Sequence, residues 1–330
     1  MKVLGPHHQG STAPGAEGAV AANVEVDPVT AAIGDDMSAS ADRRSIIVGI
    51  DGSPTAVAAA RWAGAVANRQ HAPLMLLGVV PALDHPITSS ALAETNLLPE
   101  LRAAAKQKVQ EAFEALHAEQ PDLEIRRVVE DGSPARELIR HSAAARMVVV
   151  AAKSQDRLST LLLGSTALTV ANRATCPVTV WRGRLDRPLP DERPVLVGVD
   201  GSPGGSAAVG AALELASTLG VEVTALHAWN DPDLLQWTPV PDAWDTLAQQ
   251  EEELLSERMA GWCEKYPDIT VTKVVEKATP AQALLEHGEK AQLMVTGSRG
   301  HNRLTGLLVG STSQSLLHHA PCPLVICRER

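Results

Sequence analysis

Near the C-terminal end of the chain, glycines and hydroxyl residues occur at a spacing that suits an anion. Gly297 and Gly300 are followed, after nine further residues, by Gly310, Ser311 and Thr312, which open a helical stretch. Glycines let backbone N–H groups turn toward an anion with no Cβ in the way. The start of a helix adds unpaired N–H groups and a favourable dipole. We therefore predict that this segment holds a phosphate chain from two sides.

A carboxylate is expected at the same site. Asp200 ends a short β-branched run and is followed by Gly201, Ser202 and Pro203. In a parallel α/β sheet, ligands bind outside the carboxyl ends of the strands, where the winding reverses direction. The Gly-Ser-Pro portion is typical of a helix start. Asp200 fits either an ordinary turn or a ligand contact.

Both features have counterparts earlier in the chain. SIIVGIDGSP, residues 45–54, matches PVLVGVDGSP, residues 194–203, so that Asp51 precedes Asp200 by 149 residues. VAAKSQDRLSTLLLGST, residues 150–166, matches TGSRGHNRLTGLLVGST, residues 296–312, at a separation of 146 residues. A repeat this long is a duplicated domain and not a solenoid unit.

The two copies differ at the glycines. The first copy keeps Gly164, Ser165 and Thr166 but has Ala151 and Ser154 where the second has its first two glycines. Glycine is needed there either for left-handed backbone or for a close approach to another group. We therefore expect the anion to bind the first half weakly or not at all, while the helix start survives for structural reasons.

Short β-branched runs alternate with helix-length segments in both halves. Strands of this length between helices predict parallel βαβ units, with helices on both faces of each sheet. The fold class is therefore α/β, a doubly wound parallel sheet present twice. Strands are expected at 46–51, 74–80, 124–129, 147–152 and 177–181, and at 195–200, 221–228, 270–275, 293–297 and 324–328; the helices of the second half are expected at about 204–219, 245–264, 280–290 and 310–319.

Composition divides the chain into four parts. The first part is rich in Gly, Ala, Pro and Ser without periodicity, which predicts disorder, and it lacks the pattern of a signal peptide. Translation from Met37 is as compatible with the sequence as translation from Met1. The parts are a disordered tail at 1–44, a first domain at 45–182, a polar proline-containing linker at 183–193 and a second domain at 194–330.

Composition also excludes several classes of protein. The chain has 330 residues, of which 45% are hydrophobic and only 2% aromatic, so aliphatic cores in two domains are expected. The net charge of −10 argues against nonspecific binding to nucleic acid or an anionic membrane. No apolar run is long enough for a membrane span. The four cysteines are no disulfide framework and favour a cytoplasmic protein.

The last strand of each half is an apolar segment that would otherwise be an exposed edge. PVTVW, residues 177–181, and PLVIC, residues 323–327, are the two segments. Proteins avoid exposed apolar edges. We therefore predict that the two halves form an intramolecular pair through these strands, antiparallel about a pseudo-twofold axis. The sequence leaves a homodimer and any protein partner open.

Two copies of V-G-x-D-G-S before a helix, with G-x-x-G-x9-G-S/T before the final strand, resemble the universal stress protein family in its tandem form. The resemblance covers residues 45–330, and the glycine motif is intact only in the second half. It implies two five-stranded sheets of the adenine nucleotide alpha hydrolase-like type, with strand order 3-2-1-4-5. It also implies that the second half binds ATP, with Mg²⁺ held through the phosphates.

The resemblance also assigns residues of this chain to the ligand. Asp200 would meet the nucleoside, Ala228 would line the adenine pocket, and Val275 would lie nearby. The remaining residues of the implied second-half site are Gly297, Gly300, Gly310, Ser311 and Thr312, and the weaker first-half set is Asp51, Val79, Gly164, Ser165 and Thr166. From residue type alone, Arg299, His301 and Arg303 either contact phosphate or belong to a solvated basic loop, and the solvated loop is favoured for His301. No catalytic residue and no metal ligand is assigned.

Three functions are compatible with these features. The resemblance favours an ATP-binding regulatory module of the stress response. A slow ATP hydrolase or nucleotide-processing enzyme is the first alternative, although the chain has no Walker A, dinucleotide or Ser-His-Asp motif. An interaction scaffold with vestigial nucleotide sites is the second. His318, His319 and Cys322 resemble metal ligands in type only, because a site needs more donors at a better spacing.

Overall fold

A computed structural model describes most of the chain. The described residues are 45–81, 97–152, 163–183, 185–186, 188–229, 241–300 and 309–329. The predicted disordered tail at 1–44 lies outside them, as do Ser154, His301 and Arg303.

Each half repeats the same alternation of strands and helices. The first half contains β1 (Ile46–Ile50), α1 (Pro54–Arg69), β2 (Leu74–Pro81), α3 (Leu97–Glu119), β3 (Ile125–Gly132), α4 (Pro134–Ser142), β4 (Met147–Ala151), α5 (Ser165–Arg173) and β5 (Val178–Trp181). The second half contains β6 (Val195–Gly198), α6 (Pro203–Leu219), β7 (Val223–Trp229), α8 (Pro241–Lys265), β8 (Val271–Lys277), α9 (Pro280–Gly288), β9 (Leu293–Gly297), α10 (Ser311–His319) and β10 (Leu324–Cys327). The predicted α/β pattern is confirmed.

The ten strands found among the described residues belong to one sheet. Its order is β3-β2-β1-β4-β5-β10-β9-β6-β7-β8, so each half has the predicted order 3-2-1-4-5 with parallel neighbours. Strands β5 and β10 pair antiparallel, with Val325 opposite Thr179. The predicted pairing of the last strands is confirmed, and it joins the two five-stranded sheets into a continuous one.

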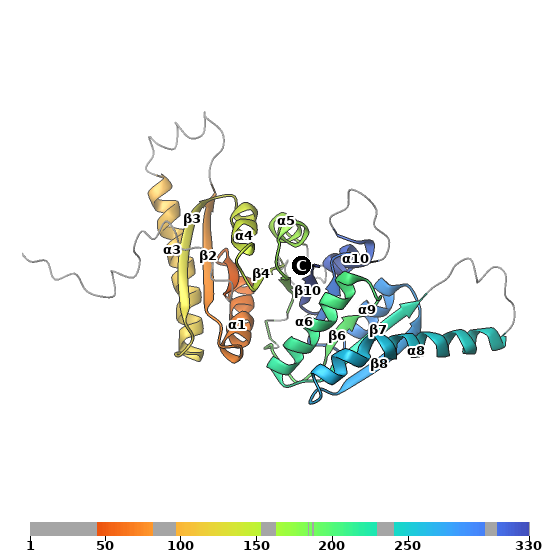
Figure 1. The fold of residues 1–330 in the computed structure, drawn as a ribbon. Helices are drawn as coiled ribbons and strands as arrows, with labels where there is room; N and C mark the ends of the chain where they lie inside the picture. The colour runs from red at the N-terminus through yellow and green to blue at the C-terminus, as the bar shows by residue number, and fades with distance from the viewer. Residues whose placement is uncertain are drawn as a thin grey trace, which may run out of the picture. The chain divides into compact units, whose positions relative to one another are not determined.

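The helices cover both faces of the sheet in two layers (Figure 1). Helices α1, α3, α6 and α8 contribute to one buried cluster, and α4, α5, α9 and α10 contribute to the other. Strand residues alternate between the clusters, as Val195 and Val197 do with Leu196. This period of two follows from the alternating direction of side chains along a strand.

The first helix of each half begins at a well-formed cap. The Oγ of Ser53 accepts a hydrogen bond from Ala56 N at 3.1 Å, and the Oγ of Ser202 accepts one from Gly205 N at 3.0 Å. A proline follows each serine at the start of the helix. A capping serine contributes about 0.5–2 kcal/mol to helix stability. The caps end strands β1 and β6 abruptly, which places the following aspartate of each half at the sheet edge.

Two arginines, Arg182 buried and Arg328 half-buried, connect the halves reciprocally. Arg182 follows β5 and donates to the carbonyls of Leu317 and His318 in the last turn of α10. Arg328 follows β10 and donates to the carbonyl of Ala171 in the last turn of α5. Helices α5 and α10 lie beside the strands that join the halves (Figure 1). A cation at a helix C-terminus is favourable, although burial lowers the pKa of Arg182 to about 10.

The cysteines lead to a first testable prediction. Burial raises the pKa of the Cys322 and Cys327 thiols to about 12, and Cys176 is also buried. Because the thiolate is the reactive form, these three are expected to resist thiol reagents at pH 8 in the native protein. Cys263 is partly exposed and should react. A chromogenic thiol titration should count one thiol per native chain and four in denaturant; rapid modification of two or more in the native state would contradict this.

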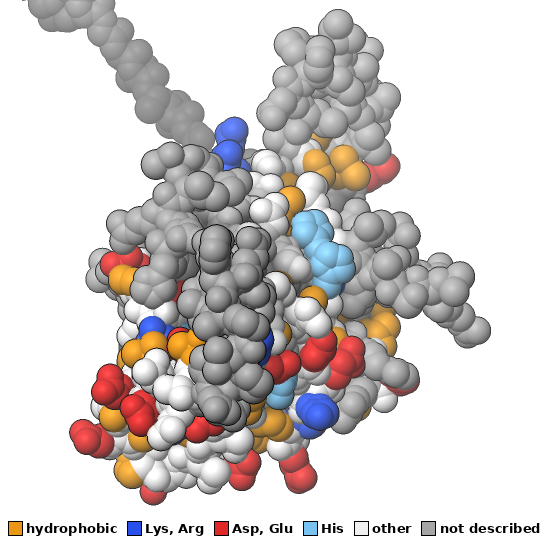
Figure 2. Space-filling model, turned by 90° about the vertical axis from the view of Figure 1, so that its right-hand side faces the viewer, with side chains coloured by type: hydrophobic (Ala, Val, Ile, Leu, Met, Phe, Trp, Pro, Cys, Tyr) orange, Lys and Arg blue, Asp and Glu red, His pale blue; other side chains and the backbone are white. Residues whose placement is uncertain are grey.

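The surface offers little general attraction for anions. Figure 2 shows a face on which acidic side chains gather and basic side chains are isolated. The chain as a whole carries a net charge of −10. None of the described helices combines the length and apolar composition that a membrane span requires. An anionic ligand therefore needs a local source of positive potential.

Candidate functional site

A pocket opens at the carboxyl ends of the strands in the second half. Its volume is about 270 Å³, close to the lower end of the range for small-molecule sites. It lies where doubly wound sheets bind ligands. The lining residues are Gly198, Val199, Asp200, Gly205, Leu226, Ala228, Pro280, Leu284, Thr296, Gly297, Arg299, Gly300, Gly310, Ser311, Thr312 and Ser313.

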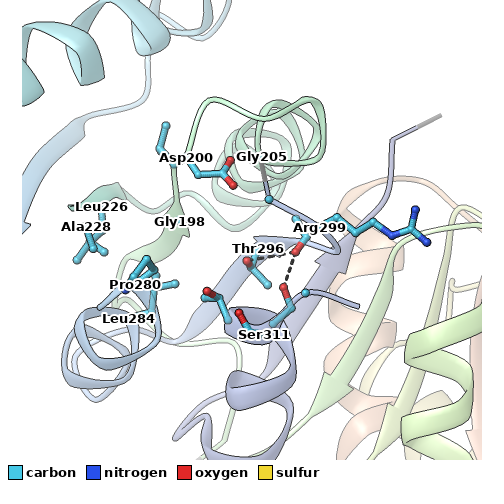
Figure 3. A pocket seen from close by; sticks show the side chains of 16 residues that line it. Gly198, Asp200, Gly205, Leu226, Ala228, Pro280, Leu284, Thr296, Arg299 and Ser311 are labelled. Carbon is cyan, nitrogen blue, oxygen red and sulfur yellow. Dashed lines mark hydrogen bonds between the residues drawn. The ribbon is translucent and has the colours of Figure 1, made fainter. Parts of the chain in front are cut away.

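The two ends of the pocket differ in chemistry (Figure 3). Leu226 and Ala228 from β7 lie near Pro280 and Leu284 from α9, which gives an apolar end. The other end is formed by Asp200, the glycine loop after β9 and the hydroxyl residues at the start of α10. This arrangement suits a ligand with a flat apolar group and an anionic tail.

The pocket brings together seven of the eight residues that the sequence placed in the second-half site. They are Asp200, Ala228, Gly297, Gly300, Gly310, Ser311 and Thr312. Val275 is not among the lining residues. Val275 packs against the cluster under α6 and α8, while Val274 and Ala228 pack against the cluster under α9. Alternation along β8 therefore points Val275 to the opposite face.

Asp200 is held in place by its own loop. Its Oδ1 accepts hydrogen bonds from Ser202 N at 2.9 Å and Ser202 Oγ at 2.7 Å. A Cβ on Gly205 would lie 2.2 Å from Oδ1, and a Cβ on Gly300 would lie 2.8 Å from Oδ2. Asp200 can occupy this half-buried position only because both neighbours are glycines.

Two segments meet backbone to backbone beside it. A Cβ on Gly297 would lie 2.7 Å from the carbonyl carbon of Gly204, and a Cβ on Gly204 would lie 2.9 Å from the carbonyl oxygen of Arg299. Gly297 and Gly300 are not among the glycines with positive φ. Of the two reasons given for glycine at these positions, the structure shows close approach and not left-handed backbone.

The glycine loop is also tied to the start of α10. Gly310 N donates to Ser298 O at 2.7 Å, and Ser313 Oγ donates to Gly297 O at 2.6 Å. Gly310 is the N-cap residue and provides no side chain to cap the helix. The first N–H groups of a helix have no partner within it. At this start they are positioned for an anion in the pocket.

The aspartate of the first half occupies a different environment. Asp51 is exposed, and its Oδ1 accepts one hydrogen bond, from Ser53 N at 2.9 Å. The Oγ of Ser53 bonds to Thr55 Oγ1 at 3.0 Å and not to the carboxylate. Thr55 and Ala56 occupy the positions of Gly204 and Gly205, so that the inward place of the carboxylate is blocked by a Cβ.

The other first-half candidates keep their structural roles. Gly164 is the N-cap of α5 with φ −66° and ψ 150°, close to the −68° and 162° of Gly310. Ser165 and Thr166 open this helix, and Val79 packs against the cluster beneath α4 and α5. The helix start is thus the same in both halves, whether or not the glycine loop is present.

Several lining residues were missed by the sequence reasoning. Gly205 could have been found, because GSPGG aligns with GSPTA in the repeat. The apolar residues Leu226, Pro280 and Leu284 carry no local signal, since each fits an ordinary core or helix start. Their place in the pocket depends on strand order and on the position of α9.

One histidine near the site makes structural contacts. The Nδ1 of His227 lies 2.7 Å from Val199 O, and its Nε2 lies 2.9 Å from the carboxylate of Glu251 on α8. His227 thus braces the strand end that precedes Asp200. Within the part of the chain that the structure describes, no three His, Cys, Asp or Glu side chains come together as a metal site.

Comparison with known proteins agrees with the fold and its duplication. Residues 42–182 and 192–328 each match the model of the universal stress protein family. The chain is 37% identical over 302 residues to a universal stress protein of Mycolicibacterium smegmatis, covering 89% of this chain and 100% of that protein. It is 36% identical over 303 residues to one from Mycobacterium tuberculosis, with 89% and 100% covered. A crystal structure of a universal stress protein from Archaeoglobus fulgidus superposes with a TM-score of 0.65 at 19% identity, covering 87% of this chain and 99% of that one.

Proposed function

The chain belongs to the universal stress protein family, and on that premise we propose that its second half binds ATP and that the protein acts as a nucleotide-dependent regulatory module of the stress response. The observation that carries the proposal is the bipartite pocket at the carboxyl edge of the sheet. Its apolar end and its glycine-lined, hydroxyl-bearing end lie side by side within about 270 Å³. A nucleotide has the same two parts.

Each part of the nucleotide has a complementary wall. The adenine is assigned to the apolar end, between Ala228 on β7 and Leu284 on α9. Asp200 offers carboxylate oxygens to the ribose hydroxyls. The phosphates are assigned to the backbone N–H groups at Gly300 and at the start of α10, where Ser311 and Thr312 add hydroxyls. Binding of anions by helix N-termini and glycine loops is well suited to a chain whose surface is otherwise acidic.

The residues at the polar end are compatible with Mg²⁺ carried on the phosphates. Mg²⁺ prefers oxygen ligands and usually keeps several waters, so it needs few protein donors. The polar end offers the carboxylate of Asp200 and the hydroxyls of Ser311 and Thr312. When bound, the metal would neutralise phosphate charge.

The proposal predicts one strong site per chain. Calorimetric titration of the full chain with ATP and Mg²⁺ should give a stoichiometry near one. The first half has Ala151 and Ser154 in place of the two glycines. A Cβ that obstructs the close approach costs about 1–3 kcal/mol at each position, so the affinity of the first half is expected to be roughly thirtyfold lower or more. If no heat of binding is measured at millimolar ATP, the proposal is wrong. Two sites of equal affinity would contradict the expected difference in ATP affinity between the two halves.

Catalytic turnover is expected to be slow. Asp200 is the only carboxylate among the lining residues of the described pocket, and its Oδ1 already accepts two hydrogen bonds from Ser202. No histidine or lysine lines that pocket to activate a water molecule. ADP production should therefore stay below about 1 s⁻¹. A faster rate that Gly300→Val abolishes would identify an ATP hydrolase instead.

A different measurement distinguishes an ATP-binding module from an interaction scaffold with vestigial nucleotide sites. Protein purified without added nucleotide is denatured, and the released nucleotide is quantified. Adenine nucleotide in the supernatant, reduced by Gly300→Val, supports a working site. Its absence, together with no binding on titration, supports the scaffold.

A further inference from the structure

A second cavity lies directly beside the pocket. Its volume is about 420 Å³, and it shares Arg299 and Gly300 with the first. Its other lining residues come from the start of α6, the end of β9 and the segment after β10: Ser202, Pro203, Gly204, Ser298, Arg328 and Glu329. The glycine loop is therefore common to both cavities.

Two arginines, Arg299 and Arg328, line this second cavity. Burial lowers the pKa of Arg328, and the positive charge of Arg299 lowers it further, so the two charges are close enough to repel. Within the described part of the chain, neither forms an ion pair with a carboxylate. The exposed carboxylate of Glu329 also lines the cavity, which leaves a net positive charge among the lining residues. An anion between the arginines would favour the charged form of both.

Arg299 turns away from the first pocket's carboxylate. In Figure 3 its side chain extends from the backbone in the direction opposite to Asp200. Arg328 is fixed from the other side by its hydrogen bond to the carbonyl of Ala171 in the first half. A guanidinium that is already anchored loses less conformational freedom when it binds an anion.

The start of α6 adds to the positive potential. Pro203 and Gly204 are the first residues of this 17-residue helix, and both line the cavity. A helix N-terminus carries about half a positive charge. The cavity thus combines two guanidinium groups, one helix start and the backbone of the glycine loop.

We propose that this second cavity is a phosphate subsite that lies next to the ATP pocket and shares Arg299 and Gly300 with it. It takes either the outer phosphate of the bound nucleotide or a separate inorganic phosphate, since both present the same oxygens to the arginines. This proposal depends on the proposed ATP binding only if the outer phosphate of the nucleotide occupies the subsite. Because Arg328 is anchored in the first half, occupancy of the subsite depends on the junction between the halves.

The test uses the full chain and the variant Arg328→Gln. AMP, which lacks the outer phosphates, and ATP are titrated separately into each protein with Mg²⁺. Loss of a charge-assisted hydrogen bond is expected to weaken ATP binding roughly tenfold or more. AMP binding should not change, so the ratio of the two affinities falls.

Arg182→Gln is the matched control. Arg182 and Arg328 are 146 residues apart, donate to equivalent helix carbonyls and each have a buried Nε without a hydrogen-bond partner. Arg328 lines the second cavity, whereas Arg182 is not among the residues that line either described pocket. A purely structural role predicts the same change in ATP affinity for both variants. The subsite predicts that Arg182→Gln leaves the ATP-to-AMP ratio unchanged.

Orthophosphate titration distinguishes the two sources. Saturable orthophosphate binding in the presence of AMP, lost in Arg328→Gln, identifies a separate phosphate. A lowered ATP-to-AMP ratio without orthophosphate binding identifies the outer phosphate of the nucleotide. Arg299→Gln, at an exposed side chain, gives the same readouts if Arg328→Gln does not fold.

The proposal is overturned if neither arginine variant changes the ATP-to-AMP ratio and orthophosphate does not bind. It is also overturned if Arg328→Gln and Arg182→Gln change that ratio equally. If neither AMP nor ATP binds the native protein, the proposed function fails, and the orthophosphate titration then decides the subsite alone.

Discussion

Gly297→Ala is expected to abolish most ATP binding and to destabilise the second half. The new Cβ would lie 2.7 Å from the carbonyl carbon of Gly204 and 2.8 Å from its oxygen. These are backbone atoms, so β9 and the start of α6 must separate to admit it. Overpacking of this kind costs about 1–3 kcal/mol. The affinity should fall roughly tenfold to more than a hundredfold, measured by calorimetric titration alongside thermal unfolding.

Ala151→Gly is the matched control for that variant. Ala151 occupies the equivalent strand end in the first half. Removing its methyl group should cost about 0.5–1 kcal/mol in stability, because glycine is less favourable in a strand. ATP binding should stay as in the native chain. Unchanged affinity in Gly297→Ala would show that the close approach does not determine the site.

The fold followed from local patterns because those patterns repeat. Each strand of the first half is a short β-branched run, and a similar run occurs 146 or 149 residues later in the second half. Each strand assignment was therefore supported by two copies of the sequence. The antiparallel pairing of β5 with β10 was predictable from the apolar character of both segments. The boundaries differ by a few residues where a cap decides them. Strand β6, for example, ends at Gly198 instead of residue 200, shortly before the N-cap Ser202 of α6.

The site was predictable where chemistry leaves a local signal. The glycine loop, Asp200 and the start of α10 are visible as residue types at fixed spacing. The apolar wall was not, because Leu226 and Leu284 look like any core residue until strand order brings β7 and α9 together. Val275 lies outside the lining of the pocket for a related reason. A single residue slip along a strand moves a side chain to the opposite face.

The second cavity could not be anticipated from sequence. Arg299 and Arg328 lie on different elements, and only the pairing of β9 with β10 brings their backbones side by side, with Cys327 opposite Gly297. Arg328 is held by a hydrogen bond that it donates to the carbonyl of Ala171 in the first half. Such a feature depends on three chain segments, none of which carries a recognisable motif.

Gly205→Ala should separate ligand binding from stability. Position 205 lies in the first turn of α6, where alanine is a better helix former than glycine by about 1 kcal/mol. The new Cβ would, however, lie 2.2 Å from Oδ1 of Asp200, which must then move outward. We expect an unfolding temperature that is unchanged or raised. ATP affinity should fall at least tenfold through the loss of a hydrogen bond to a charged group, worth about 1.5–3 kcal/mol.

Ala56→Gly tests the same substitution in reverse. Ala56 is the equivalent residue of α1 in the first half, where Asp51 already lies exposed. Glycine there should lower the free energy of unfolding by about 1 kcal/mol and leave ATP binding unaltered. If Gly205→Ala lowered stability and affinity together, the loss of binding would be a consequence of unfolding. Opposite movements of the two quantities would mean that glycine at 205 costs helix stability and serves the carboxylate of Asp200.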